Sequence, residues 1–565
     1  MSKANKLLES MIGVSQLDEK PAGLYGILQT SNYSDFVILD DGGTAQLEFQ
    51  GAKLANKCLP GDHVFWDGEK CRLELRDEQP PIVGTIELTN KSKYGLTSRG
   101  IPIYLFTPYN KCYPHFIVGC SEKDVSRNKI GLIKFDDWSS SSTFPRGQLQ
   151  QVLGQSGDLE AERQALMWLC SPWKYPKGVN IPKTSERGLR KELKGFTFNI
   201  DPVGCKDVDD VLTFEELESK TGWRVSITIS DVARFVEDGG PIDIYASLIG
   251  QTLYNIDGGV LRPMLPVEYS EQECSLIPGK QSYGISLQFT WDGKTITDTE
   301  WCESTFETNR SYGYEEFQES DSPYKPILQQ IASHLAGENI DDSHKWIEQC
   351  MLFYNKEAGK QLKNTSQGVL RRHKAPDREK LERYKGVIAD LEHLAYSAAE
   401  YCLSEESDTI HFGLESDHYA HASSPIRRYA DLVNQRALKG IINGVVDRAI
   451  VPIAMYDMNY RAKLNRGYAR DITFLEAVSS GKTAFRGIIL EKTFTVIADE
   501  VKVKIYIPEW RRAISAKYRM AGENAVYSRD EKRVINVTEF REVDVSFTCN
   551  FNQRCWKERI IINIA

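Results

Sequence analysis

Four aspartates stand within ten positions of the sequence, at Asp201, Asp207, Asp209 and Asp210. Carboxylates this close repel one another, so some must take up protons unless a cation neutralises them. Carboxylate oxygens suit Mg²⁺ or Mn²⁺, and Mg²⁺ favours phosphate substrates, which indicates phosphoryl-transfer or phosphodiester chemistry. In an extended chain Asp207 and Asp209 share one side, with Asp210 turned away unless the strand bulges. A solvated acidic loop is the plain alternative.

The flanks of this segment argue against a solvated loop. The runs Gly195–Ile200 and Trp223–Ile229 read as half-buried strands, so the acids lie where one strand ends and the next begins. Pro202 and Gly204 are expected to bend the backbone and bring the first acid back toward the other three. A metal site is plausible on these grounds alone.

A second dense segment runs from His411 to Asp431. Ser424 precedes a proline and predicts a helix over Pro425–Ile442, with the Ser424 hydroxyl as its cap. Arg427 and Arg428 would fall in its first turn, where a cation opposes the helix dipole and needs an anionic partner such as phosphate. An Arg427–Asp431 pair on a solvated face is the equally weighted alternative.

The elements around both segments predict a multidomain α+β protein. Small β-barrels are indicated by short alternating strands separated by Asp- and Gly-rich turns. Helices are predicted over Asp158–Trp168, His344–Lys363 and Arg378–Ser404. The expected parts are a tail (1–18), a first OB or cold-shock-like barrel (19–78), a second one (79–150), a linker helix (151–190), a central α+β catalytic domain (191–481) and a C-terminal OB barrel (482–565).

Composition limits the class of protein. The chain has 565 residues and a net charge of −9, which argues mildly against indiscriminate nucleic-acid binding but allows a local basic channel. Its start lacks a secretory signal, no stretch is long and apolar enough to span a membrane, and the twelve cysteines show no Cys-x-x-Cys pair. We expect a monomeric intracellular protein of the reducing cytoplasm, with no membrane association.

Taken jointly, the two segments resemble the RNB catalytic domain of the RNase II / RNase R family of exoribonucleases. The aspartates match an Ile-Asp-Pro…Asp-x-Asp-Asp motif, and further ordered blocks are Ile229–Val236, Gln251–Tyr254 with Met264–Pro266, Ile347–Asn355, Leu370–Pro376, and His411–Leu414 with Ser424–Tyr429. A weaker likeness upstream, Phe135–Trp138 through Phe144–Gly147, resembles the eukaryotic exosome-type branch, without its N-terminal endonuclease domain.

The resemblance implies two cold-shock-like barrels, an RNB domain and a C-terminal OB barrel, with hydrolysis of single-stranded RNA from the 3′ end to nucleoside 5′-monophosphates. By matching position, Asp201, Asp207, Asp209 and Asp210 would hold Mg²⁺, with Mn²⁺ as a substitute, and the attacking water. Arg427 would neutralise charge on the scissile phosphate. The residues that would contact RNA are Tyr254, by stacking on a terminal base, Glu348, at the 3′ end, and His421, Ser424 and Arg428.

Some positions depart from the family pattern. The segments Tyr314–Ile347 and Pro376–His411 are short, and the first of them usually carries a second stacking aromatic. Ala469 stands where bacterial members have a glutamate, and Gln435 replaces a histidine. These departures concern the grip on the terminal nucleotides.

Three functions compete. A processive, metal-dependent 3′→5′ exoribonuclease is the leading hypothesis. The alternative is a catalytically weakened RNB-fold protein that binds RNA, against which the intact acids speak, because a pure binder gains nothing from like charges facing a phosphate. A hydrolase of small phosphoesters fits the acids but leaves three barrels without a role.

Overall fold

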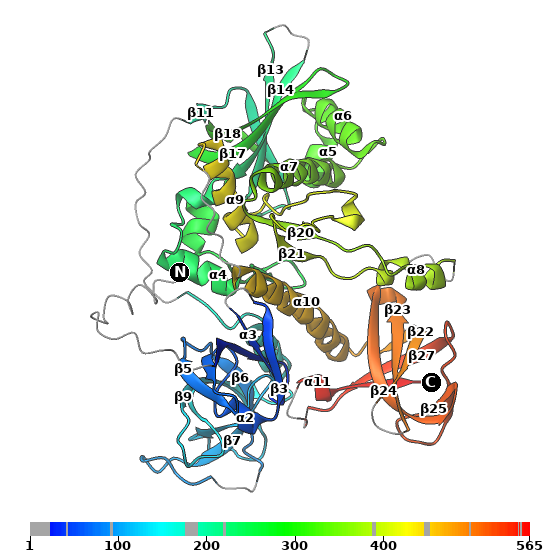
Figure 1. Cartoon of the computed structure of the whole chain (residues 1–565). Coiled ribbons are helices and arrows are strands. Elements are labelled where there is room, and N and C mark those ends of the chain that lie inside the picture. The colour runs from blue at the N-terminus through cyan, green and yellow to red at the C-terminus, as the bar shows by residue number, and fades with distance from the viewer. Residues whose placement is uncertain are drawn as a thin grey trace, which may run out of the picture.

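The computed structural model describes residues 23–40, 43–90, 94–175, 190–218, 222–386, 391–445, 453–495, 499–551, 553 and 556–565. It has three β-rich parts joined by helices, with the central sheet and its helices at one end of the molecule (Figure 1). The multidomain α+β class is thereby confirmed. The predicted tail over 1–18 lies outside the described residues. No helix in the described ranges is long and apolar enough to cross a membrane.

The N-terminal part consists of two small β-modules, of which the second closes into a barrel with strand order β10-β8-β7-β6-β9. The first is a five-stranded antiparallel sheet with order β3-β2-β1-β4-β5. Strands of the first are β1 (Leu24–Thr30), β2 (Asp35–Leu39), β3 (Ala45–Gln50), β4 (His63–Trp66) and β5 (Cys71–Leu75), with α2 (Ala52–Ala55) after β3. Strands of the second are β6 (Ile82–Ile86), β7 (Ile103–Pro108), β8 (Phe116–Gly119), β9 (Lys129–Asp137) and β10 (Arg146–Gln155).

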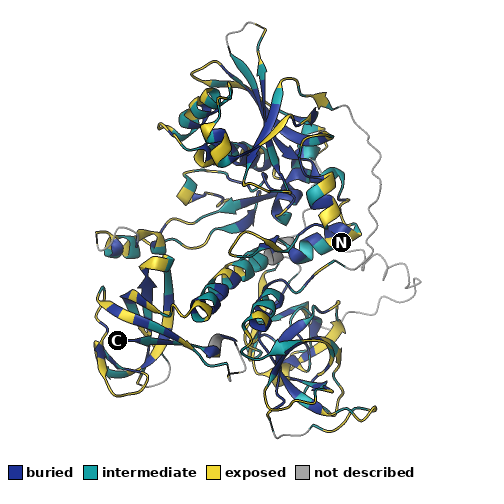
Figure 2. Ribbon diagram, turned by 180° about the vertical axis from the view of Figure 1, so that it is seen from behind, coloured by how far each residue is buried: buried dark blue, intermediate teal, exposed yellow. Residues whose placement is uncertain are grey.

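The central part contains a seven-stranded mixed sheet of order β11-β18-β17-β14-β13-β12-β19. Its strands are β11 (Lys191–Glu192), β12 (Phe196–Asp201), β13 (Asp210–Glu216), β14 (Trp223–Ser230), β17 (Gln281–Trp291), β18 (Ile296–Glu307) and β19 (Arg310–Gly313). The main core lies where this sheet packs against α5 (Tyr314–Glu319), α6 (Lys325–Ala336) and α7 (Ser343–Thr365), and buried residues follow these surfaces (Figure 2). The predicted helix over His344–Lys363 is α7.

Smaller elements complete this part. They are α4 (Pro241–Ile249), the hairpin β15 (Leu253–Tyr254) and β16 (Val260–Arg262), the pair β20 (Val369–Arg372) and β21 (Glu400–Leu403), α9 (Tyr429–Ile442) and the long α10 (Ile453–Ser480). The helix predicted over Arg378–Ser404 is wrong beyond its first turns, since α8 spans only Arg378–Tyr384. The chain then turns through Gly386 at φ 75° and ends in β21, which pairs with β20. Tyr384 and Leu391 are buried against the C-terminal part instead.

The C-terminal part is a curled sheet of order β26-β25-β24-β23-β22-β27-β28. Its strands are β22 (Ala484–Phe494), β23 (Glu500–Ile507), β24 (Arg512–Gly522), β25 (Ala525–Tyr527), β26 (Val534–Asn536), β27 (Glu542–Cys549) and β28 (Ile560–Ile564), with α11 (Trp556–Arg559) before β28. The strand order of this module is open, whereas the second N-terminal module is a closed barrel.

A buried ion pair joins the N-terminal and C-terminal parts. The predicted helix over Asp158–Trp168 is α3 (Leu159–Cys170), and its Glu162 bonds Arg559 of α11, with both side chains fully buried. The Tyr109 hydroxyl donates to Glu162 at 2.8 Å, and Arg559 also donates to Ser156 at 3.1 Å. Removing one charge of such a pair leaves the other uncompensated in a medium of low polarity.

Arg559→Met is therefore expected to destabilise the full chain by about 3–5 kcal/mol, because the Glu162 carboxylate stays buried without its partner. A thermal or urea unfolding curve measures the loss. Arg486→Ala, which removes one side of an exposed Arg486–Glu542 pair, is the control and should change stability by less than about 1 kcal/mol. Equal stability of Arg559→Met and the parent chain would contradict the assigned role of the pair.

Candidate active site

Asp201 is the last residue of β12 and is oriented by a neighbour on the same strand. The Asn199 amide donates to Asp201 Oδ2 at 2.7 Å, and the Ser311 hydroxyl donates to Asn199 Oδ1 at 2.6 Å. Strands β12 and β19 run parallel, with Asp201 opposite Gly313 and Asn199 opposite Ser311. Because side chains two apart on a strand share a face, this register places Asn199 beside the carboxylate that it holds.

The loop from Pro202 to Asp209 turns back as the sequence predicts. The Cys205 amide donates to the Pro202 carbonyl at 3.0 Å, and Gly204 takes a φ of 85°, which suits a glycine in a tight turn. Beyond the turn, the Tyr254 hydroxyl donates to Asp207 Oδ2 at 3.3 Å. Tyr254 therefore contacts one of the four acids in addition to any stacking role.

Asp209 is buried and pairs with the second dense segment. Its Oδ1 accepts from the Ile426 amide at 3.0 Å and its Oδ2 from Arg427 Nε at 3.1 Å. The Arg427 side chain is still 47% exposed and donates through Nη2 to the Ser424 hydroxyl at 3.1 Å. Asp209 raises the pKa of Arg427 against the opposing effect of burial. The structure thus brings the two dense segments together, 218 positions apart in the chain.

Asp201, Asp209 and Asp210 share an electrostatic environment that disfavours their ionised forms. Burial raises the pKa of Asp209 to about 7, although Arg427 works against this rise. Burial, then the charges of Asp201 and Asp209, raise the pKa of Asp210 well above its usual range. Burial also raises the pKa of Asp201, which the Asn199 hydrogen bond opposes. Asp210, the first residue of β13, is therefore not isolated on the far side of the strand, because the charges of Asp201 and Asp209 both affect its pKa.

The segment before α9 differs from its predicted form. The helix begins at Tyr429 rather than Pro425, and the residue at its N-cap position is Arg428. Ser424 does not cap it, because its hydroxyl accepts from Arg427 while the amides of Arg427 and Arg428 donate to its carbonyl. The Arg427–Asp431 pair, which was the alternative to a phosphate contact, is absent among the described contacts of these residues. Asp431 is buried and accepts from Arg428 Nη2 at 2.9 Å and from the Ser424 amide at 2.8 Å.

Among the described residues, neither His421 nor Glu348 forms a hydrogen bond or ion pair with the four acids. His421 bonds the Tyr401 hydroxyl through Nδ1 at 2.9 Å, and burial followed by the Arg428 charge lowers its pKa well below the usual range. It is therefore neutral at physiological pH. Glu348 is exposed on α7, and no hydrogen bond or ion pair within the described chain joins it to the acids.

Two departures from the family pattern find a place in the structure. Gln435 is buried on α9, where it accepts from the Ala233 amide at 2.9 Å and donates to the Ser230 carbonyl at 2.6 Å. Its amide is used inside the protein and does not reach toward the acids. Ala469 is exposed on α10.

Sequence reasoning missed three neighbours of the acids. Asn199 and Ser311 orient Asp201, and Tyr314 lies close enough that Asp201 and Asp210, after burial, raise its pKa to about 12. Tyr314 also stacks on His344, with ring centres 4.0 Å apart. The alternation of β12 could have indicated Asn199, since this residue shares a face with Asp201. Ser311 could not have been found in this way, because no local sequence pattern indicates that β19 pairs with β12.

The donor set fits a divalent cation even though the side chains are not gathered around one point. In the part of the chain that the structure describes, no group of three or more Asp, Glu, His or Cys side chains is arranged to hold a metal ion. Part of the reason is that Asp209 is bonded to Arg427, and Asp207 to Tyr254. Buried carboxylates with raised pKa values are nevertheless the electrostatic condition that a cation relieves.

Metal affinity is therefore expected to rise with pH. Because the pKa of Asp209 is about 7, this carboxyl is mostly protonated at pH 6 and mostly ionised at pH 8. Binding below pH 7 must displace that proton, so Mg²⁺ or Mn²⁺ affinity should fall about tenfold per pH unit there. Calorimetric titration in buffers of different ionisation enthalpy measures both affinity and proton release. An affinity that is constant from pH 6 to 8 would contradict the raised pKa.

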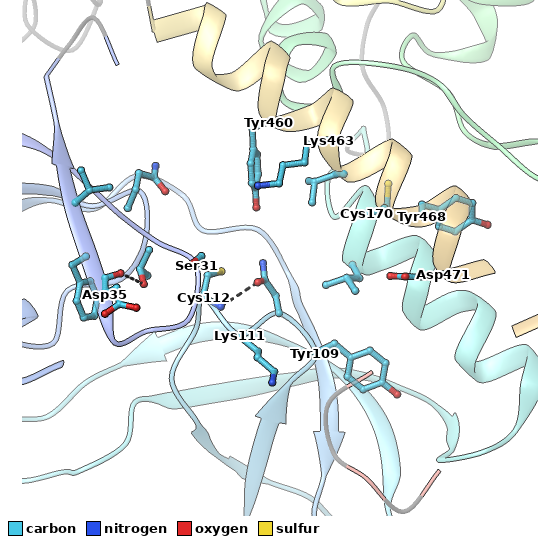
Figure 3. Close-up of a pocket in the computed structure, with 18 of the residues that line it drawn as sticks. Ser31, Asp35, Tyr109, Lys111, Cys112, Cys170, Tyr460, Lys463, Tyr468 and Asp471 are labelled. Atoms are coloured by element: carbon cyan, nitrogen blue, oxygen red, sulfur yellow. Dashed lines mark hydrogen bonds between the residues drawn. The ribbon is translucent and has the colours of Figure 1, made fainter. Parts of the chain in front are cut away.

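A cavity between the N-terminal modules and α10 lies apart from the acids. It has a volume of about 840 Å³ and lies between the first N-terminal sheet, the second barrel, α3 and α10 (Figure 3). Tyr460 and Lys463 of α10 line it opposite Asp35 of β2. None of the predicted site residues lines this cavity.

Family models match the regions that carry this geometry. The model of the RNB domain matches residues 189–323 and 320–444, and the model of the Dis3-like cold-shock domain 2 (CSD2) matches residues 103–171. The chain is thus a distant member of the RNB-domain exoribonuclease family. The match contains all four aspartates and Arg427.

Curated relatives come from both eukaryotes and bacteria. A protein described as a probable exosome complex exonuclease RRP44 from Caenorhabditis elegans is 24% identical over 486 residues, which are 68% of this chain and 50% of the relative. Ribonuclease R of Buchnera aphidicola is 23% identical over 530 residues, 78% of this chain and 71% of the relative. The two identities are nearly equal, so they assign the chain to neither branch.

Solved structures share the fold across most of the chain. Mycoplasma genitalium RNase R in complex with ribose-methylated single-stranded RNA has a TM-score of 0.68 and 17% identity, covering 96% of this chain and all of that one. Yeast Ssd1, described as a pseudonuclease, has a TM-score of 0.63 and 17% identity, covering 97% of this chain and 83% of that one. At this identity the likeness concerns the fold.

Proposed function

We propose that this chain is a metal-dependent 3′→5′ exoribonuclease that hydrolyses single-stranded RNA processively to nucleoside 5′-monophosphates. The observation that carries the proposal is a buried Asp209 and a half-buried Asp210, both with raised pKa values, next to a half-exposed arginine. Maintaining like charges in a buried site is unfavourable unless a cation and a phosphate use them. Family membership supplies the substrate class and the polarity.

Each residue has a stated task in this proposal. Mg²⁺, when bound by Asp201, Asp207, Asp209 and Asp210, would stabilise charge on the entering and leaving oxygens of the scissile phosphate. Asn199 keeps the Asp201 carboxylate in one orientation. The exposed part of the Arg427 guanidinium faces the substrate phosphate while Asp209 and Ser424 hold its Nε and Nη2.

Around these groups other residues hold the 3′ end. Tyr254 presents its ring beside Asp207, and Glu348 and His421 are assigned to the terminal nucleotides by matching family position. Arg428 and Ser424 act mainly by fixing the loop that carries Arg427, because Asp431 binds both of them. Exposed 2′-hydroxyls provide the preference for RNA over DNA.

The second candidate is an RNB-fold protein that binds RNA without cutting it. The observation in its favour is the likeness to yeast Ssd1, described as a pseudonuclease. The hydrogen bonds of Asp201, Asp207 and Asp209 to Asn199, Tyr254 and Arg427 favour catalysis, because binding alone requires none of these contacts. The two candidates differ in whether mononucleotides are released.

Asp209→Asn tests the acids directly. The amide keeps the size of the side chain but removes its charge, so mononucleotide release from a uniformly labelled single-stranded RNA should fall at least about a thousandfold. EDTA should abolish release in the parent chain and leave RNA binding measurable. Mononucleotide release by Asp209→Asn at the parent rate would contradict the metal mechanism. RNA binding by the parent chain without mononucleotide release would favour the non-enzymatic candidate.

Arg427→Ala separates chemistry from binding. Turnover should fall about 10²–10³-fold, because the positive charge at the scissile phosphate is lost, while the affinity for long RNA weakens far less. Arg427→Lys is the matched variant, since it keeps the charge but cannot form the fork of hydrogen bonds to Asp209 and Ser424. Single-turnover rates and equilibrium binding measure the two effects. Equal losses in both quantities for Arg427→Ala would exclude the assigned role.

A further inference from the structure

Helix α10 and strand β21 are fixed face to face by one side chain. The Asn459 amide of α10 accepts from the Tyr401 backbone N–H at 2.8 Å and donates to the Tyr401 carbonyl at 3.0 Å. Arg466 follows Asn459 by seven residues, or two helical turns, and so lies on the same face of α10. The cavity in Figure 3 is lined by Lys463, Gly467 and other residues of α10, but not by Arg466.

A second arginine stands on the neighbouring strand. Arg371 of β20 is paired with Tyr401 in the sheet register, and its guanidinium carbon lies 4.6 Å from the centre of the Tyr401 ring. The Arg371 backbone N–H donates to the Tyr419 carbonyl at 2.7 Å. Its Nη1 is buried and has no hydrogen-bond partner, which is uncommon for a charged donor.

These two arginines lack the partners that their neighbours have. Arg372 pairs with Glu400 and Glu406, and Arg428 pairs with Asp431. No carboxylate of the described residues forms an ion pair with Arg371 or Arg466. Arg466 is exposed on α10 and Arg371 is half-buried. Partial burial, and then the charge of Arg371, lower the pKa of Arg466, as expected for two neighbouring cations. Neighbouring guanidiniums of this kind are stabilised by an anion that both can contact.

We propose that Arg371 and Arg466 form a binding site for one backbone phosphate of the RNA strand. The inference rests on the proposed function for the identity of the strand. His421, which bonds Tyr401 and lies three residues before Ser424, connects this pair to the loop that carries Arg427. Because the scissile bond lies at the 3′ end, the phosphate held by Arg371 and Arg466 belongs to a nucleotide on its 5′ side.

A binding titration without catalysis tests the proposal. The full chain is mixed with a fluorescent single-stranded RNA of about twelve nucleotides in EDTA, and Kd is measured over a series of salt concentrations. Arg466→Ala should weaken binding about tenfold and reduce the slope of log Kd against log salt by about one. Arg466→Glu should weaken binding further, and Arg466→Lys should restore part of the affinity.

Arg470→Ala is the matched control. Arg470 lies one turn further along α10 and donates to Asp471 at 2.7 Å, so its charge is already paired and its removal should leave Kd and the salt slope unchanged. Arg371→Lys retains a charge but loses the planar contact with Tyr401, and should weaken binding as well. Unchanged melting temperatures establish that the variants fold.

The outcomes separate this inference from the proposed function. A parent-like Kd and salt slope for Arg466→Ala would overturn the phosphate site, as would equal losses for Arg466→Ala and Arg470→Ala. An absence of RNA binding by the parent chain would overturn it too. If the parent chain binds RNA through Arg466 but releases no mononucleotides with Mg²⁺, the phosphate site stands and the exoribonuclease proposal fails.

Discussion

The burial of Asp209 is the constraint on which the arrangement of the site depends. A carboxylate withdrawn from water needs donors, and Asp209 finds them in the Ile426 amide and the Arg427 side chain. This contact joins the start of β13, an interior strand of the central sheet, to the loop before α9. The same loop is tied to the chain before β15, because the Thr252 amide donates to the Arg427 carbonyl. Three distant segments are therefore held in one place by the contacts of Asp209 and one backbone hydrogen bond.

The sequence made the presence of the acids and arginines predictable, but not their contacts. Strong strand patterns before and after the aspartates indicated β12 and β14 correctly, because alternation is a local property. The predicted start of α9 was wrong. Ser424 and Pro425 have the local pattern of a helix N-terminus, but the Ser424 hydroxyl binds Arg427 in the folded chain and the helix begins at Tyr429. Tertiary hydrogen bonding outweighed the capping preference.

The helix predicted over Arg378–Ser404 failed for a related reason. The apolar residues of this segment have a helical spacing, but they are buried by different partners. Tyr384 and Leu391 pack on the C-terminal part, whereas the end of the segment forms β21 and pairs with β20. Arg466 and Asn199 were not indicated either, because their significance lies in neighbours from other strands or helices. Gln435 looked like a functional departure in the sequence, yet its hydrogen bonds place it in the core.

The Glu162–Arg559 pair has a consequence for how this long chain loses its structure. Each charge has its partner only while α3 and α11 are both folded, so the unfolding of one module leaves the charge of the other buried and uncompensated. The N-terminal barrel and the C-terminal sheet are thereby energetically coupled, although they are far apart in the chain. Independent melting of the two modules is therefore disfavoured, and their coupling depends on Glu162 and Arg559.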